Sequence, residues 1–459
     1  DPAKPKMGVS RPLPPDQMRD PASAVARPIG DQETMEVDLQ KFRRDGYLIL
    51  RNIVPPEQLD EIRLLTELMV DREKARSAAQ RQNGEPPGGA WYQSAQPRLS
   101  MDSIETQTAG VIDFCLGETT YGVSHQLMQA PTTALTAFGA LCSGLIDYGY
   151  TDWHRDASSA EQAPLSGMQA DLMANAPGYV QWNVALYDDD VFWILPQSHK
   201  QPSTEVQRRQ LLLDPRSPLQ GGVPAKLRAG NAIVYPNLMM HWGSKYTSRF
   251  RRTIHMGYRS FNAEIFPYLH QLDWYHQDEF MRYVSADARV CLMRSAELYN
   301  RERDQIERTY RAMVAGDKST FLSDLAQLHP GELGRMVSMV LLCRIANKVV
   351  KLHQPEIAKL SVEERRPIID GSPPAYYTED LAARFTVAEA GVLAQRFAVL
   401  NNRLREDEDR VHQHYSALYA ELKPDAQTPP NFESRSLRTF NSDMPKGFGV
   451  DEFIASWKE

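Results

Sequence analysis

The 459-residue chain has little cysteine, no long apolar run and no excess of positive charge. Its 4 cysteines include no CxxC pair, which argues against a disulfide framework or a thiolate zinc site and favours a reducing compartment. No segment approaches the roughly 20 apolar residues of a membrane helix, and the opening residues lack the apolar stretch of a signal peptide. A formal net charge of -7 disfavours binding to nucleic acid through electrostatic attraction. We therefore expect a soluble cytoplasmic protein with neither membrane nor nucleic-acid partners.

Three segments of the chain differ in composition. Residues 1–36 are rich in proline and poor in large apolar side chains, which predicts a flexible arm. Residues 37–261 open with helix, strand and helix patterns and continue as short β-type runs between turns, which is typical of a β-barrel or β-sandwich. Residues 262–459 have helical periodicity and form the predicted C-terminal region. The clearest helical patterns lie at 280–313, 334–352 and 386–422.

The most informative stretch is residues 150–156. Within it His154 and Asp156 are two positions apart, and in a strand such residues point to the same face and could bind one metal. A second imidazole would complete the two-His, one-carboxylate face that leaves positions open on Fe(II). His241 is the candidate for this second imidazole, because it lies near the end of a turn-and-strand pattern at 227–243. The chain between His154 and His241 is long enough for several antiparallel strands to bring His241 back to the metal.

A basic strand-like run follows His241 by ten positions. A guanidinium at Arg251 could form a bidentate ion pair with the distal carboxylate of a bound 2-oxo acid. Thr253 would face the same side and could hydrogen-bond that carboxylate, whereas Arg252 would point the other way. Arg252 stays the alternative if the strand is out of phase by one residue.

The order of these motifs resembles the phytanoyl-CoA dioxygenase family of Fe(II)/2-oxoglutarate oxygenases, over roughly residues 38–260. The matching motifs are a helix and Gly-aromatic strand at 42–52 with the next helix start at 55–59, Trp-His-x-Asp at 153–156, a strand at 183–186 leading to a Pro-x-Ser-His turn at 195–200, Ala-Gly-x at 229–231, His-Trp-Gly-Ser at 241–244, and Arg251. Gln197 and Asn231 replace a usual Gly and a usual Asp, both at turn positions, so neither change removes a ligand. Arg155 is bulkier and more basic than the Gln common at that position.

The resemblance implies an α+β fold, in which a double-stranded β-helix (jelly-roll, cupin-like) core carries flanking helices and a large helical C-terminal extension. It implies Fe(II) bound by His154, Asp156 and His241. It also implies 2-oxoglutarate, bound by Arg251 and Thr253, and O2 as co-substrates. Asn183 matches a position that contacts the 2-oxo acid, although a structural role for a buried Asn is an alternative.

The implied reaction is the hydroxylation, or another oxidation such as desaturation or ring closure, of an unactivated C–H bond of a small molecule, with decarboxylation of 2-oxoglutarate to succinate. The carboxylate at Asp156 predicts oxygenation rather than halogenation, because halogenating relatives carry a small residue at that position. Residues 90–180, where the pocket walls are expected, do not single out a primary substrate.

Other interpretations of the sequence stay open. His276 and Asp278 form a second His-x-Asp pair, but at a predicted helix start, where residues two apart diverge by about 200°. The chain could instead be a non-catalytic jelly-roll scaffold whose helical C-terminal region binds a protein partner, although the intact triad argues against it. That region is also a candidate surface for homo-oligomerisation. A plain metal-dependent hydrolase would have no use for Arg251.

Overall fold

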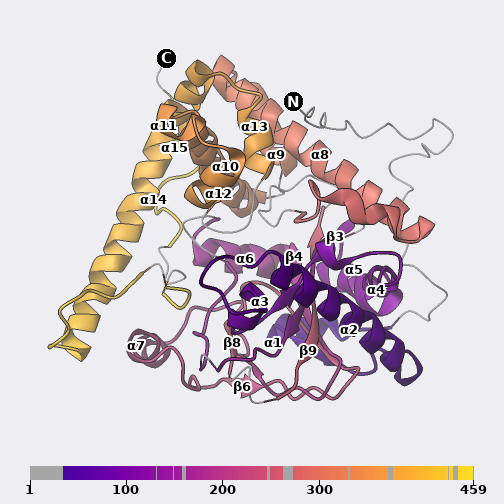
Figure 1. Ribbon diagram of the computed structural model, residues 1–459. Helices are drawn as coiled ribbons and strands as arrows, with labels where there is room; N and C mark the ends of the chain where they lie inside the picture. Colours follow the sequence, from indigo (N-terminus) through magenta and orange to yellow (C-terminus); the bar gives the residue numbers. More distant parts are fainter. Residues whose placement is uncertain are drawn as a thin grey trace.

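The computed structural model is shown as a ribbon in Figure 1. It describes residues 35–130, 132–147, 149–157, 162–244, 249–261, 272–328, 331–370, 376–432, 434–437 and 443–457. The arm predicted at 1–36 lies outside this set except for its last two residues. Among the described residues, no helix is both long enough and apolar enough to cross a membrane.

The first described helix, α1 (Leu39–Asp45), is bounded by residues that suit its two ends. The Asp38 carboxylate accepts a hydrogen bond from the Lys41 N–H at 2.8 Å and so caps the first turn. Gly46 ends the helix in the left-handed conformation, at φ 86°, which favours glycine. The next elements are β1 (Leu48–Leu50) and α2 (Pro56–Ala79), as the sequence pattern predicts.

The described strands form two antiparallel sheets. The larger sheet has the strand order β1-β7-β4-β9-β3-β2, and the smaller one has the order β6-β5-β8. Central strands β4 and β9 are almost wholly buried, since each has neighbours on both sides. The strands that follow β1 are β2 (Arg98–Leu99), β3 (Thr133–Cys142), β4 (Tyr179–Ala185), β5 (Phe192–Ile194), β6 (Val223–Pro224), β7 (Ala232–Tyr235), β8 (His241–Gly243) and β9 (Arg252–Ser260). The fold is thus mixed α and β with antiparallel sheets.

Helices also interrupt the region that was predicted as short strands alone, so that prediction was incomplete. These helices are α3 (Ala90–Gln93), α4 (Gly110–Cys115), α5 (Val123–Met128), α6 (Leu165–Asn175) and α7 (Glu205–Leu213), with single turns at Met101–Ser103 and Glu118–Gly122. α7 begins with a capping box between Thr204 and Gln207, whose side chains exchange hydrogen bonds with each other's backbone N–H.

The C-terminal third is helical, and the predicted patterns at 280–313, 334–352 and 386–422 correspond to α8, α10 and α14. The elements are a short 3-10 helix at Asp278–Arg282, α8 (Ala286–Ala315), α9 (Lys318–Leu328), α10 (Gly331–Leu352), α11 (Pro355–Ala358), α12 (Val362–Asp370), α13 (Tyr376–Ala382), α14 (Val387–Leu422) and α15 (Val450–Ala455). Thr386 and Glu389 form a capping box that starts α14.

These helices pack directly on the sheets and on the helices between the strands. α8 contacts β3, α10 contacts α6 and α14 contacts α7. Figure 1 shows α14 running down one side of the molecule, from the other C-terminal helices to α7. Arg259 of β9 and Glu302 of α8 form a fully buried ion pair, with Arg259 Nη1 3.0 Å from Glu302 Oε1. The C-terminal region is therefore in contact with the strands that carry the candidate site.

Candidate metal centre

His154 and His241 lie side by side because their backbones pair. Each donates its N–H to the other's carbonyl oxygen at 2.9 Å, in an isolated antiparallel bridge. His241 opens β8, but residues 151–157 do not form the strand that the sequence argument assumed. Instead, Asp156 is placed by its own backbone N–H, which donates to the Asn237 carbonyl at 3.0 Å. The predicted convergence is present, but it is produced by loop-to-strand contacts rather than by strand alternation.

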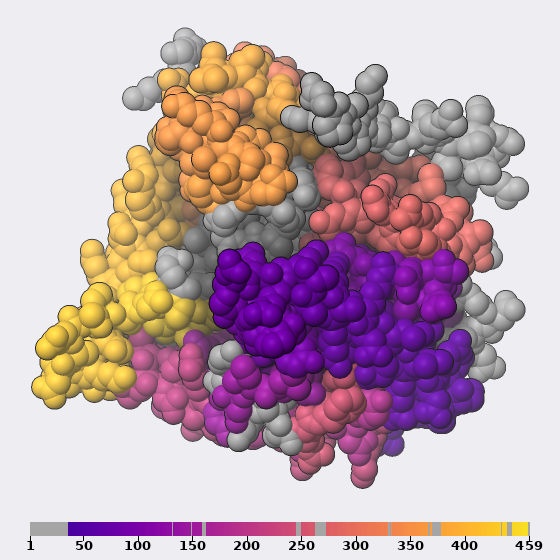
Figure 2. All heavy atoms as spheres, viewed as in Figure 1, coloured from indigo at the N-terminus to yellow at the C-terminus, as the bar shows by residue number. Residues whose placement is uncertain are grey.

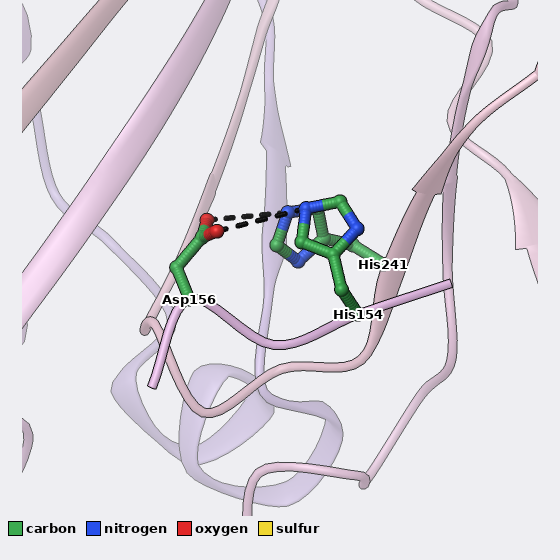
Figure 3. A group of neighbouring side chains, drawn as sticks. All are labelled: His154, Asp156 and His241. Atoms are coloured by element: carbon green, nitrogen blue, oxygen red, sulfur yellow. Dashed lines mark ion pairs between the residues drawn. The ribbon is translucent and has the colours of Figure 1, made fainter. Parts of the chain in front are cut away.

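The three side chains point toward one another (Figure 3). His154 Nε2 lies 3.6 Å from Asp156 Oδ1, and His241 Nε2 lies 3.3 Å from Asp156 Oδ2. One potential ligand atom from each residue falls within a span of 4.8 Å. This is the donor set, two imidazoles and one carboxylate, that suits Fe(II) while leaving other metal positions open.

Backbone carbonyls orient both imidazoles. His154 Nδ1 lies 2.7 Å from the Asp152 carbonyl oxygen, and His241 Nδ1 lies 3.0 Å from that of Met239. Each carbonyl can only accept, so each Nδ1 carries the proton and donates it. Both Nε2 atoms therefore present a lone pair to the centre of the triad, as metal ligation requires.

The charges around the triad favour its metal-binding protonation state. Burial lowers the pKa of His154 well below its usual range, which keeps the imidazole neutral and able to ligate. Burial alone would raise the pKa of Asp156, but the surrounding positive charge, which includes Arg435, outweighs burial and holds that pKa well below its usual range. A neutral His154 and an ionised Asp156 are the forms that bind a cation.

Two further side chains hold the Asp156 carboxylate. Gln181 of β4 donates from Nε2 to Oδ2 at 2.7 Å. Arg435, from the C-terminal region, donates from Nη2 to Oδ1 at 3.3 Å across a separation of 279 residues. Neither residue was predicted from the sequence. Gln181 lies in β4 two positions before Asn183, whereas Arg435 belongs to no motif that could have pointed to it.

Arg251 lies immediately before β9 and is buried with Asp189. Its Nε donates to Asp189 Oδ2 at 2.6 Å, and Thr253 Oγ1 donates to the same oxygen at 3.1 Å. Asp189 Oδ1 accepts the Val191 N–H at 2.9 Å. Burial alone would raise the pKa of Asp189, but the Arg251 guanidinium outweighs burial and lowers it. The structure thus places Arg251 and Thr253 together, on a carboxylate that the sequence argument did not identify.

Arg252 points to a different partner. Its Nε and Nη2 atoms donate to the two carboxylate oxygens of Glu67 on α2, at 2.7 and 3.1 Å. Neighbouring residues of an extended chain face opposite sides, which accounts for the separation of Arg251 and Arg252. Arg252 therefore connects β9 to a covering helix, away from Asp189.

Asn183 lies between the triad and the Arg251 pair along the β4–β9 ladder. In register, Gln181 is opposite Gly257, Asn183 is opposite His255 and Ala185 is opposite Thr253. Residues two apart on a strand share a face, so Gln181 and Asn183 line one side of β4. Asn183 Oδ1 lies 2.9 Å from His255 Nδ1, and its Nδ2 donates to the Tyr235 hydroxyl at 3.3 Å. This row of polar side chains links the metal centre with Arg251.

The second His-x-Asp pair has no comparable surroundings. His276 Nε2 lies 3.3 Å from Asp380 Oδ2 of α13, and Asp278 begins the 3-10 helix at Asp278–Arg282. The clustered metal-type ligands found among the described residues are those of His154, Asp156 and His241. His276 thus serves in a contact between the turn that precedes the 3-10 helix and α13.

Comparisons with known proteins give one family match and several similar solved structures. Residues 42–254 match the family model described as Phytanoyl-CoA dioxygenase (PhyH). No curated protein sequence matches the chain. Similar solved structures include the epimerase SnoN in complex with Fe3+, alpha ketoglutarate and nogalamycin RO, which is 15% identical, covers 48% of this chain and 82% of its own, and has a TM-score of 0.32.

Two others have comparable scores. EctD from S. alaskensis in its apoform is 16% identical, covers 52% of this chain and 83% of its own, and has a TM-score of 0.36. HygX from Streptomyces hygroscopicus with nickel and 2-oxoglutarate bound is 14% identical, covers 48% of this chain and 85% of its own, and has a TM-score of 0.34.

Proposed function

Since residues 42–254 match the model of the phytanoyl-CoA dioxygenase (PhyH) family, we propose that the chain hydroxylates an unactivated C–H bond of a small-molecule substrate while 2-oxoglutarate is decarboxylated to succinate. The chain is an Fe(II)- and 2-oxoglutarate-dependent dioxygenase that uses O2. The observation that carries the proposal is the convergence of His154, Asp156 and His241 on one point.

The residues fit an iron ion. His154 and His241 offer Nε2 lone pairs and Asp156 offers carboxylate oxygens, all from one side. Bound iron supplies the activation of O2 and of the 2-oxo acid that ends in succinate, CO2 and an oxidised substrate. Gln181 keeps the Asp156 carboxylate turned toward the imidazoles, and the Asp152 and Met239 carbonyls fix the two ring orientations.

Arg251 binds the distal carboxylate of 2-oxoglutarate in this proposal. Asp189 takes the Nε donor and so fixes the plane of the guanidinium, and the edge formed by the two Nη atoms is the one we assign to the co-substrate. Thr253 lies beside it through the shared Asp189 oxygen. Asn183, midway along the same row, would contact the co-substrate between iron and Arg251.

The jelly-roll topology, the boundary between the oxygenase domain at 37–261 and the helical region at 262–459, and the cytoplasmic location all stay predictions. Homo-oligomerisation through the helical region does too. Size-exclusion chromatography with light scattering on the full chain would decide the oligomeric state.

The direct test is anaerobic titration calorimetry of the full chain with Mn(II), which replaces Fe(II) without turnover, and then with 2-oxoglutarate. We expect one metal per chain and tight 2-oxoglutarate binding only after metal has bound. A chain that binds 2-oxoglutarate equally well without metal would contradict the proposed function.

A further inference from the structure

The C-terminal segment, defined as residues 424–432 and 434–437, reaches the metal centre from outside the family-matched region. Leu437 is buried in a cluster with Trp153, the neighbour of His154, and with Tyr415 and Leu418 of α14. Phe432 stacks on His412 of α14 with 4.2 Å between ring centroids. In Figure 2 the yellow C-terminal part lies against the magenta α7 region. The segment is thus held on the sheet-bearing part of the molecule by apolar contacts on both sides of Arg435.

Solvent reaches the triad from the side of Asp156. The Asp156 side chain is 29% exposed, whereas those of His154 and His241 are 5% and 7% exposed. Arg435 lies on that accessible side, since its Nη2 is 3.3 Å from Asp156 Oδ1 and its own side chain is 45% exposed. A molecule that approaches the metal from this side comes close to the Arg435 guanidinium.

The contact with Asp156 uses few of the hydrogen-bond donors of Arg435. A guanidinium has five N–H donors, and among the described residues Arg435 donates one hydrogen bond. At 3.3 Å that bond is longer than the 2.7–2.9 Å or so of a strong charge-assisted pair, and Gln181 already holds the other oxygen of Asp156 at 2.7 Å. Gln181 therefore makes the shorter contact with Asp156, and most of the Arg435 donors are not used by the hydrogen bond to Asp156.

We propose that Arg435 binds an anionic group of the primary substrate, a carboxylate, phosphate or sulfate, and that the C-terminal segment forms a wall of the active site. The inference rests on the proposed function. The planar guanidinium matches such oxyanions with two parallel hydrogen bonds. With the divalent metal, Asp156 and the dianionic 2-oxoglutarate in place, the centre carries a net charge of about -1, so a cation at this wall offsets that charge for an incoming anion.

The test uses small anions as probes on the full chain loaded with Mn(II) and saturating 2-oxoglutarate, without O2. Paramagnetic relaxation of the 31P signal of methylphosphonate and of the 13C signal of labelled acetate reports binding near the metal. We expect saturable enhancement with the unmodified chain, at least tenfold weaker binding with Arg435→Gln, and less than threefold loss with Arg435→Lys. Arg410→Gln, an exposed position on α14, is the matched control and should leave binding unchanged.

The outcomes separate this inference from the proposed function. If the unmodified chain fails to bind Mn(II) or 2-oxoglutarate in calorimetry, the proposed function fails and this inference with it. If both bind but neither probe shows enhancement that depends on Arg435, the substrate inference alone is overturned. A tenfold loss of Mn(II) affinity in Arg435→Gln would also overturn it, because Arg435 would then be a positioning residue for Asp156. The neutral ester dimethyl methylphosphonate should show no saturable enhancement of paramagnetic relaxation, either with the unmodified chain or with Arg435→Gln.

Discussion

Replacing Arg251 by Gln tests the assignment of the 2-oxoglutarate carboxylate. The change removes the cation of a buried pair and leaves the Asp189 carboxylate without its main charge partner. Truncating one member of a desolvated charge pair costs roughly 2–5 kcal/mol of binding energy. A tenfold change in Kd corresponds to about 1.4 kcal/mol, so the Kd for 2-oxoglutarate should rise roughly 30-fold to several thousandfold.

The same change should also destabilise the fold, because an uncompensated buried carboxylate costs roughly 3–5 kcal/mol. The double variant Asp189→Asn/Arg251→Gln separates the two effects. It removes both charges, so the free energy of unfolding should recover most of that loss, whereas 2-oxoglutarate affinity should stay low.

Calorimetry with Mn(II)-loaded protein and urea unfolding measure the two quantities. Arg252→Gln is the matched control: it breaks the pair with Glu67 and should change 2-oxoglutarate affinity less than threefold. The reasoning is refuted if Arg252→Gln weakens 2-oxoglutarate binding and Arg251→Gln does not, or if the double variant regains affinity along with stability.

Three further predictions follow from the site and its surroundings. Gln181→Leu should weaken Mn(II) binding roughly 10- to 100-fold in calorimetry, because it removes the donor that holds Asp156 Oδ2; unchanged affinity would mean that Gln181 is not an orienting partner. Burial lowers the pKa of His199 to about 4, so the folded chain binds fewer protons than the unfolded one below about pH 6.5, and stability should fall as the pH drops toward 4. His199→Gln should make that fall shallower by up to about 1.4 kcal/mol per pH unit in urea unfolding, and an identical slope would contradict the buried neutral imidazole. Finally, the unmodified enzyme should give no chlorinated product in mass spectrometry with chloride present, because Asp156 fills the position a halide would need; a chlorinated product would show that Asp156 is not a ligand.

The convergence of His154, Asp156 and His241 could be predicted from the sequence because its signals are local and ordered. His154 and Asp156 are two positions apart, and His241 ends a recognisable turn and strand. The geometric reason was partly wrong, since His154 is in a single β-bridge and Asp156 is placed by the Asn237 carbonyl. Three side chains can thus converge without the regular strand that the argument assumed.

Residues that act through distant contacts could not be predicted. Asp189 forms an isolated β-bridge with Leu227 after β4, and becomes relevant only because Arg251 and Thr253 both donate hydrogen bonds to it. Arg435 approaches Asp156 where Leu437 and α14 pack in one cluster with Trp153. Neither acidic nor basic side chains carry a local pattern that specifies such partners. By contrast, the long helices α8, α10 and α14 have strong periodicity and could be located from sequence.

The most direct test of the account is iron stoichiometry and succinate formation measured together in the unmodified chain and in His241→Ala. The account predicts one Fe(II) per chain and Fe(II)-dependent succinate release from 2-oxoglutarate, with both lost in His241→Ala. His276→Ala, at the other His-x-Asp pair, is the control and should retain both. Full iron binding and succinate formation by His241→Ala, or their loss in His276→Ala alone, would contradict the assignment of the metal centre.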